Sequence, residues 1–130
     1  MKREFKFRAY IKDEGRLLDV NLIDFDDEYV RVWDEYGENE EEWLFKDCEL
    51  MQYIGLDDVN GVEIYENDIV KSNYKYAQPK ISQIIMEDGN SYIAGEDLAT
   101  GNEMLVSDHI DEIEVIGNIH ANHELLEERK

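Results

Sequence analysis

Residues 49–70 read ELMQYIGLDDVNGVEIYENDIV, and this stretch contains the clearest turn in the chain. The turn is Asp57-Asp-Val-Asn-Gly61, which separates the apolar runs Leu50–Ile54 and Val62–Tyr65. Its Asn-Gly pair tolerates the positive φ angles that a tight hairpin turn requires. We therefore predict two strands joined by a hairpin, the first of them ended by Gly55.

Short runs that are typical of strands continue on both sides of this hairpin. Another turn signal, Glu87-Asp-Gly-Asn90, falls between two of them. Short strands with turns at intervals of about 8–12 residues favour a small barrel or sandwich. A short helix is expected from His123 to about Arg129, with the Asn122 side chain as its N-cap. The further strands that we predict are residues 4–10, 17–25, 29–33, 43–45, 69–70, 81–86, 91–94, 102–106 and 110–116.

Two of these strands have predicted faces. Residues 4–10 alternate charged and apolar side chains, so Phe5, Phe7 and Ala9 share one face and the charges share the other. In residues 29–33, the two valines share one face, and the Tyr, Arg and Trp side chains share the opposite face. We expect the apolar face of each strand to lie against the core.

Residues 34–42 read DEYGENEEE and form the densest acidic run in the chain. Like charges at this density resist packing, so we predict an exposed loop or a mobile connection. If the chain has two parts, the join between them falls within residues 34–49.

Composition bounds the class of protein. The 130 residues are 42% hydrophobic, which is enough for the core of one domain, or of one domain with a small appendage. No apolar run approaches the ~18 residues of a membrane-spanning helix, and residues 1–10 do not read as a signal peptide. A single Cys excludes an intramolecular disulfide. We therefore expect a soluble, cytoplasmic protein with no membrane partner.

The net charge of −20 is distributed unevenly along the chain and argues against general binding to a phosphate backbone. Residues 1–16 carry six bases against three acids, whereas residues 19–49 carry thirteen acids against two bases. The basic segment could pair with its own domain, or with a neighbouring subunit in a homo-oligomer; simple solvation is the plainer alternative. We take the following residues as a candidate interaction surface: Lys6, Arg8, Tyr10, Glu40, Glu41 and Glu42.

No catalytic, cofactor-binding or metal-binding residues are predicted. His120 and His123 are three residues apart, but a zinc site needs two or three more ligands at regular spacing, and the sequence offers no second cluster. The 57–61 turn lacks two oxygen ligands of a calcium loop. Cys48 has no recognisable base or orienting group near it in the sequence, so an inert Cys is the better interpretation.

A nucleic-acid surface has one candidate segment, at the start of the chain. Phe5, Phe7 and Tyr10 could stack on bases beside Lys6 and Arg8. The alternative is a strand that buries one aromatic face in the core.

Three blocks of sequence together resemble the YopX family of phage and prophage proteins. The first is FKFRAY at residues 5–10, with LIDF at 22–25. The second is the whole of residues 49–70, and the third is VIGNI at 115–119 with NHELL at 122–126. Their order and spacing match the family over residues 3–126.

The resemblance implies a mostly β protein with an SH3-like barrel in its C-terminal half. On this basis we divide the chain into an N-terminal β segment, residues 1–48, and a barrel region with a short C-terminal helix, residues 49–130. One continuous domain over residues 3–126 is the alternative. Asn67 stands where the family usually has Gly, and Asn tolerates the left-handed backbone expected there.

The resemblance also implies a phage or prophage origin in a bacterial cell, but it implies no reaction and carries over no functional residue. We therefore favour a non-catalytic accessory protein that binds a macromolecule, in the first instance a protein. One alternative is an acidic mimic of nucleic acid that blocks a host DNA-binding protein. Another is direct nucleic-acid binding by a small barrel.

Overall fold

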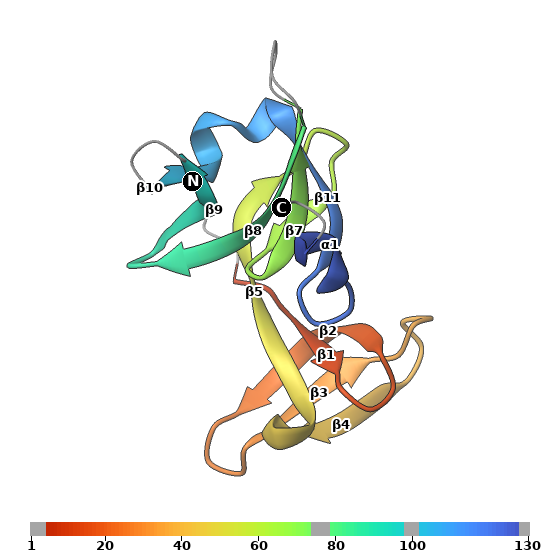
Figure 1. Cartoon of the computed structure of the whole chain (residues 1–130). Coiled ribbons are helices and arrows are strands. Elements are labelled where there is room, and N and C mark those ends of the chain that lie inside the picture. Colours follow the sequence, from red (N-terminus) through yellow and green to blue (C-terminus); the bar gives the residue numbers. More distant parts are fainter. Residues whose placement is uncertain (1–4, 74–78, 98–101, 128–130) are drawn as a thin grey trace. The chain divides into compact units, whose positions relative to one another are not determined.

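The computed structural model of the chain describes residues 5–73, 79–97 and 102–127 (Figure 1). The chain is mainly β, as the sequence predicts, and its strands form two antiparallel sheets. Contacts divide it into two compact units, Met1–Tyr53 and Ile54–Lys130. The predicted division into domains after residue 48 stays a prediction.

The described strands are β1 (Phe7–Ile11), β2 (Arg16–Asp24), β3 (Tyr29–Trp33), β4 (Glu40–Leu44), β5 (Cys48–Asp57), β6 (Glu63–Tyr65), β7 (Asp68–Ser72), β8 (Lys80–Glu87), β9 (Asn90–Asp97), β10 (Asn102–Leu105) and β11 (Ile113–Asn118). The helical elements are the 3-10 turns η1 (Phe45–Asp47), η2 (Val106–Asp108) and η3 (Ile110–Glu112), and the helix α1 (Glu124–Glu127).

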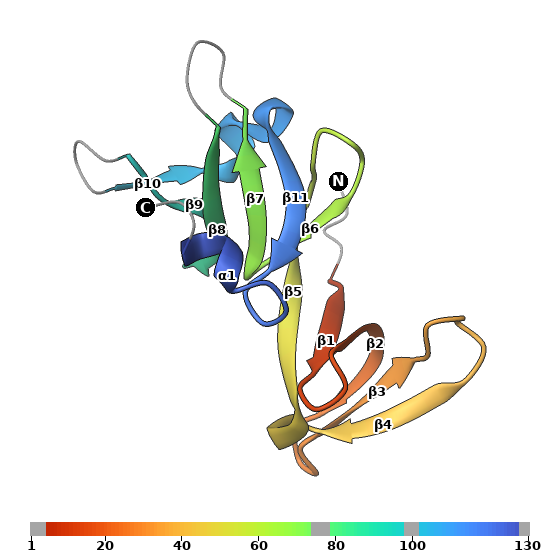
Figure 2. The same ribbon diagram turned by 45° about the vertical axis from the view of Figure 1, so that its right-hand side comes forward.

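In the first unit, β4, β3, β2, β1 and the first part of β5 lie side by side in that order (Figure 2). β3 occupies the predicted residues and has the predicted faces, because Val30 and Val32 are fully buried while their neighbours are not. The buried core of this unit consists of Ala9, Ile11, Leu18, Val30, Val32 and Cys48.

The predicted core face of the first strand is confirmed for Ala9, but the prediction is wrong for the aromatic residue Phe5. β1 begins at Phe7, and its fully buried residues are Ala9 and Ile11. Phe5 lies before the strand and is 70% exposed. β1 runs between β2 and β5, and its buried face there consists of aliphatic side chains.

The prediction of a loop for the whole acidic run is also wrong. Residues 34–39 connect two strands, but Glu40–Glu42 begin β4, which pairs with β3 in antiparallel register. The prediction considered only the repulsion between neighbours along the chain. In the folded chain, Arg31 of β3 lies directly across from Glu42, and Arg16 of β2 binds Glu41.

In the second unit, β10, β9, β8, β7 and β11 form a five-stranded sheet in that order. The predicted turn at residues 87–90 joins β8 to β9, and Asp88 and Gly89 take φ angles of +52° and +83°. The buried core consists of Ile64, Val70, Ile84, Ile93, Val106 and Ile113, with Ile54 and Leu56 from the end of β5 packed against it. No closed barrel is defined by this strand order, so the SH3-like barrel stays a prediction.

The predicted turn at residues 57–61 is confirmed, but its geometry depends on a carboxylate. Gly61 takes a φ of +80°, and Asn60 does not take positive φ. Asp58, only 6% exposed, accepts hydrogen bonds from the backbone N–H groups of Asn60 and Val62 at 2.8 and 2.9 Å. Its second oxygen accepts one from Val115 N–H at 2.8 Å, which ties the turn to β11.

The strand before this turn is longer than predicted. Gly55 does not end it, because β5 continues to Asp57 while Gly55 takes a φ of +89°. At the corner before β7, Asn67 takes a φ of +68°, as predicted, and the fully buried Asp68 accepts a hydrogen bond from Tyr65 N–H at 2.8 Å.

The predicted N-cap is wrong, although a short helix is present. α1 spans Glu124–Glu127, and Arg129, the predicted end, lies outside the described residues. The side-chain oxygen of Asn122 accepts a hydrogen bond from Asn118 N–H at 3.2 Å instead of capping the helix. A Cβ at Gly117 would collide with the Asn122 side chain, so a larger residue there would displace that side chain.

We predict that Asp58→Ala lowers the free energy of unfolding by about 2–4 kcal/mol, because three backbone N–H groups lose their acceptor. Chemical denaturation measures the change. Asp108→Ala, at an exposed carboxylate of η2, is the control and should be nearly neutral. Equal stability of the two variants would contradict the role assigned to Asp58.

Candidate interaction surface

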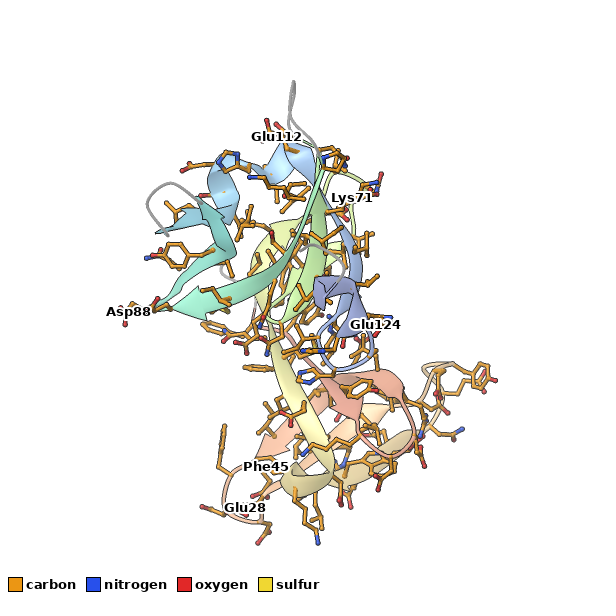
Figure 3. The ribbon with its side chains drawn as sticks, viewed as in Figure 1. Glu28, Phe45, Lys71, Asp88, Glu112 and Glu124 are labelled. Atoms are coloured by element: carbon orange, nitrogen blue, oxygen red, sulfur yellow. The ribbon has the colours of Figure 1, made fainter. Side chains whose placement is uncertain are left out.

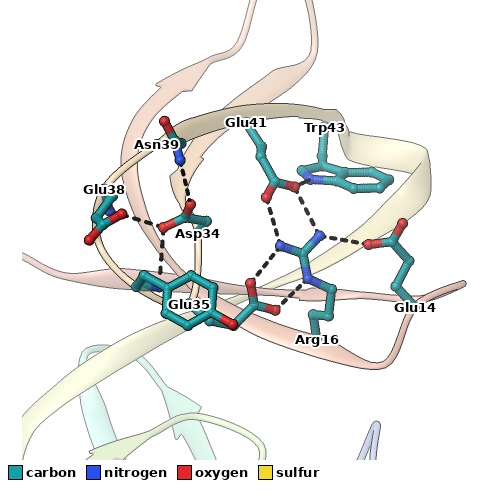
Figure 4. Close-up of polar contacts among 9 residues, drawn as sticks. Glu14, Arg16, Asp34, Glu35, Glu38, Asn39, Glu41 and Trp43 are labelled. Carbon is teal, nitrogen blue, oxygen red and sulfur yellow. Dashed lines mark hydrogen bonds and ion pairs between the residues drawn. The ribbon is translucent and has the colours of Figure 1, made fainter.

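Arg16, the first residue of β2, is the centre of a charged cluster in the N-terminal unit (Figure 4). Its guanidinium donates two hydrogen bonds to Glu35 at 2.6 and 2.8 Å, two to Glu41 at 2.6 and 2.9 Å, and one to Glu14 at 2.6 Å. A guanidinium has five N–H donors, so every donor of Arg16 has an acceptor. We call these four residues the Arg16 cluster.

The cluster joins two parts of the chain that are far apart in the sequence, because Glu35 and Glu41 lie 19 and 25 residues from Arg16. Glu14 lies in the turn between β1 and β2, Glu35 in the loop between β3 and β4, and Glu41 in β4. Arg16 shares a face of β2 with the buried Leu18, so the cluster lies at the rim of the core. The indole N–H of Trp43 donates to Glu41 at 3.1 Å and adds a further contact to the same carboxylate.

The loop of residues 34–39 is organised by its first residue. The Asp34 carboxylate accepts hydrogen bonds from the backbone N–H groups of Tyr36 and Glu38 at 3.1 and 3.0 Å, and from the Asn39 side chain at 3.1 Å. Gly37 takes a φ of +69° within this loop. The loop therefore has a defined conformation, and it holds Tyr36 84% exposed.

Hydrogen bonding keeps the acidic groups of this region ionised. The bonds from Arg16 lower the pKa of Glu35 and of Glu41, and the bond from Glu38 N–H is the largest cause that lowers the pKa of Asp34. The same bonds, with Glu35 first, raise the pKa of Arg16. Three carboxylates against one guanidinium leave the Arg16 cluster with an excess of two negative charges.

A second, smaller ion pair lies on the opposite face of the β3–β4 pair. Arg31 is directly across from Glu42, and its guanidinium lies 3.0 Å from the Glu42 carboxylate and 3.8 Å from that of Glu40. These side chains are 36–56% exposed, so water screens their attraction.

The structure separates the residues of the predicted interaction surface. Arg8 and Tyr10 share the face of β1 opposite Ala9, and the Lys6 ammonium lies 5.4 Å from the centre of the Tyr53 ring. The three acidic residues lie on β4, with β2 and β3 between them and β1. Among them, Glu41 turns toward Arg16, whereas the other two turn to the Arg31 side.

Two bases of the segment at the start of the chain form ion pairs within their own unit. Arg16 binds the three carboxylates of its cluster, and Lys12 lies 3.3 Å from Glu49. Lys2 and Arg3, counted in that segment, lie outside the described residues.

The predicted base-stacking platform is not assembled. Phe7 and Tyr10 lie on opposite faces of β1, so the aromatic side chains do not form one surface. Phe5 and Phe7 instead line an open hollow of about 240 Å³ with residues 20–23 of β2.

Two features that sequence reasoning missed are Arg16 and Tyr36. Both were visible in the sequence, Tyr36 as an aromatic residue within the acidic run and Arg16 as the base after a Gly-containing turn.

The groups that could carry other chemistry are engaged within the fold. Cys48 is 5% exposed, its thiol donates to Leu44 O at 3.4 Å, and burial raises its pKa, so it is a poor nucleophile at neutral pH. His109 Nδ1 lies 2.9 Å from the Glu112 carboxylate. Within residues 5–73, 79–97 and 102–127, no three His, Cys, Asp or Glu side chains are placed to hold a metal ion. None of the helices in that part of the chain is long and apolar enough to cross a membrane.

The fold and this surface define a class: a mainly β protein of two antiparallel sheets that presents an acidic hairpin. The sequence profile of the YopX protein family matches residues 6–127, and the chain therefore belongs to the YopX family. The resemblance stated from the three sequence blocks is confirmed.

Crystal structures of two proteins are among those that are similar to the chain. Protein EF1440 from Enterococcus faecalis is 29% identical, with a TM-score of 0.65, and the match covers 96% of this chain and 99% of that one. Protein yopX from Bacillus subtilis is 20% identical, with a TM-score of 0.63 and coverage of 93% and 97%, and this likeness shows the fold alone. A comparison with functionally curated proteins gives no match.

We predict that Arg16→Gln removes part of the pH dependence of stability. Glu35 and Glu41 have pKa values below the ordinary 4.5 in the folded protein, so their contribution is present above about pH 4.5 and is lost as the pH falls through the lowered values. The variant should be less stable than the wild type at about pH 7, and the difference should shrink toward about pH 3.

Denaturant unfolding across this pH range measures the difference. Arg31→Gln is the control, since Arg31 binds its carboxylates less closely and at greater exposure. A difference for Arg16→Gln that stays constant across the pH range would contradict the assignment.

Proposed function

We propose that the chain works by binding another protein without catalysing a reaction, and that the β3–β4 hairpin is the contact surface. The observation that supports this most directly is Tyr36, which is 84% exposed in a loop whose backbone is held by the Asp34 carboxylate and whose Glu35 side chain is held by Arg16. Tyr is enriched among residues that dominate binding energies. A loop already held in one conformation loses little entropy on binding.

The charge of this surface indicates the chemistry of the partner. The Arg16 cluster has an excess of two negative charges, and Glu38 adds another on the loop itself. Complementary potentials speed association and reject partners of like charge. The partner in this proposal is therefore a protein with a basic surface.

The acidic-mimic alternative finds less support in this arrangement. A mimic of nucleic acid presents negative charges at the intervals of phosphates, whereas Glu14, Glu35 and Glu41 converge on one guanidinium. Direct nucleic-acid binding is opposed by the net charge of −20 and by the division of the aromatic side chains between two faces of β1.

The setting that we propose is the cytoplasm of a bacterial cell, with the chain as a phage or prophage accessory protein. An SH3-like barrel in the C-terminal unit belongs to the same proposal. It is supported by the single core that Ile64 of β6 shares with Val70 and Ile113 of the five-stranded sheet.

The test is affinity capture from lysate of the bacterial host, followed by mass spectrometry and by affinity measurement on the purified partner. We predict that Tyr36→Ala weakens binding by about thirtyfold, as expected for a contact residue worth about 2 kcal/mol. Val59→Ala is the matched control, because Val59 is 55% exposed in the other unit.

A partner that binds wild type and Tyr36→Ala equally well would contradict the proposal. Light scattering at several concentrations addresses the remaining alternative, in which the partner is a second copy of the chain. In that case the oligomer should dissociate in the Tyr36→Ala variant.

A further inference from the structure

β4 is the last strand of its sheet, and within the described residues only β3 pairs with it. The hydrogen bonds at the two ends of the β3–β4 pair show which backbone groups of β4 point toward β3. At one end, Phe45 N–H donates to Glu28 O at 2.9 Å, and Figure 3 labels both residues at that end of the hairpin. At the other end, Asp34 N–H donates to Asn39 O at 2.8 Å.

Residues of an antiparallel strand alternate between directing their N–H and C=O groups toward the partner strand and away from it. Counting in steps of two from either end of the hairpin, Glu41 and Trp43 direct these groups toward β3. Glu40 and Glu42 therefore direct theirs out of the sheet. A row of such groups is a template for one more strand.

The side chains of the same two residues set the charge beside this edge. Glu40 and Glu42 are 45% and 56% exposed, and they share one guanidinium, that of Arg31. One negative charge on this face is thus left over. An incoming strand with Lys or Arg opposite these positions gains cross-strand attraction.

This charge also argues against a second copy of β4 as the occupant. Pairing of β4 with itself brings the Glu-Glu-Glu runs of two chains together, and like charges in direct opposition are destabilising. Edge strands commonly carry charge for this reason. The charge of this edge therefore disfavours pairing with a second copy of β4 and favours pairing with a basic strand.

Next to the edge lies an open hollow of about 310 Å³, at the end of β4 nearer to Phe45. Its lining residues are Asp27, Tyr29, Glu42, Trp43 and Leu44. Leu44 is 45% exposed, so an apolar surface is accessible there. When an extended peptide adds to the edge of a sheet as a further strand, backbone hydrogen bonds supply the affinity. Hollows of this kind bind every second side chain of the peptide and so supply the specificity.

We propose that β4 binds an extended, basic segment of a partner protein, which adds to the sheet as one more strand. In the antiparallel orientation, the segment carries an apolar residue opposite Leu44, a basic residue opposite Glu42 and a second basic residue opposite Glu40. The sequence of the segment is therefore apolar-x-basic-x-basic, where x is any residue. This inference rests on the proposed function, since it specifies how the hairpin engages its protein partner.

The probe is the peptide Thr-Val-Thr-Leu-Thr-Lys-Thr-Lys-Thr, titrated into the ¹⁵N-labelled full chain. We expect the amide signals of Glu40 and Glu42 to shift, and their hydrogen exchange to slow, in a saturable manner. The same peptide with N-methyl groups on the backbone nitrogens that face β4 keeps its charge but cannot form the ladder, and it should not bind. Unchanged amide signals at millimolar peptide, or equal binding of the methylated peptide, would overturn the proposal.

Charge is tested with Glu42→Lys, which should bind the basic peptide about tenfold more weakly and bind a Glu-for-Lys version of the peptide better than the wild type does. Asp108→Lys carries the same change in net charge and should bind as the wild type does. Equal affinity of these two variants would contradict the proposal. If Glu42→Lys does not fold, the methylated peptide still decides the question.

The outcomes of these experiments distinguish failure of the strand-addition proposal from failure of the protein-binding proposal. If the peptide does not add to β4 but capture of the partner still depends on Tyr36, the strand addition is wrong and the protein-binding role stands. If the peptide binds β4 but the captured partner is indifferent to Tyr36 and to Glu42, the protein-binding role of the hairpin is wrong.

Discussion

The guanidinium of Arg16 allows an acidic stretch of the sequence to form part of the N-terminal sheet. Its five hydrogen bonds to Glu14, Glu35 and Glu41 bring a turn, a loop and an edge strand together at the rim of the core. Isolated surface ion pairs contribute little, but bidentate pairs in a network contribute more. The Arg16 side chain is 22% exposed, so water screens the attraction only in part. Without this cation the carboxylates of the acidic run would repel each other.

The parts of the fold that depend on local chemistry could be predicted from the sequence. The strand at residues 29–33, the turn that ends at Gly61 and the left-handed corner at Asn67 all follow from side-chain alternation or from backbone preference. The acidic strand and its cluster could not be predicted, because Arg16 is 19 and 25 residues away from Glu35 and Glu41. Only strand register brings such residues together, and register is set by the whole sheet.

The arrangement explains how one hairpin can be both stable and strongly charged. On one face of β4, the Glu41 carboxylate accepts hydrogen bonds from Arg16 and from the indole N–H of Trp43. On the opposite face, Glu40 and Glu42 share Arg31 and remain largely exposed. The carboxylate of β4 nearer to the core is thus hydrogen-bonded within the unit, whereas the two on the opposite face remain largely exposed to solvent. This acidic edge, with the exposed Tyr36 in the adjoining loop, is the surface that we propose for recognition of a basic protein.

The most direct test of the central claim is amide hydrogen exchange of residues 34–44 in the wild type and in the Arg16→Gln variant. If the guanidinium holds the hairpin, these amides exchange faster in the variant, while the amides of β7 and β8 in the other unit keep their protection. Equal protection of residues 34–44 in both proteins would show that the acidic hairpin forms without Arg16 and would contradict this account.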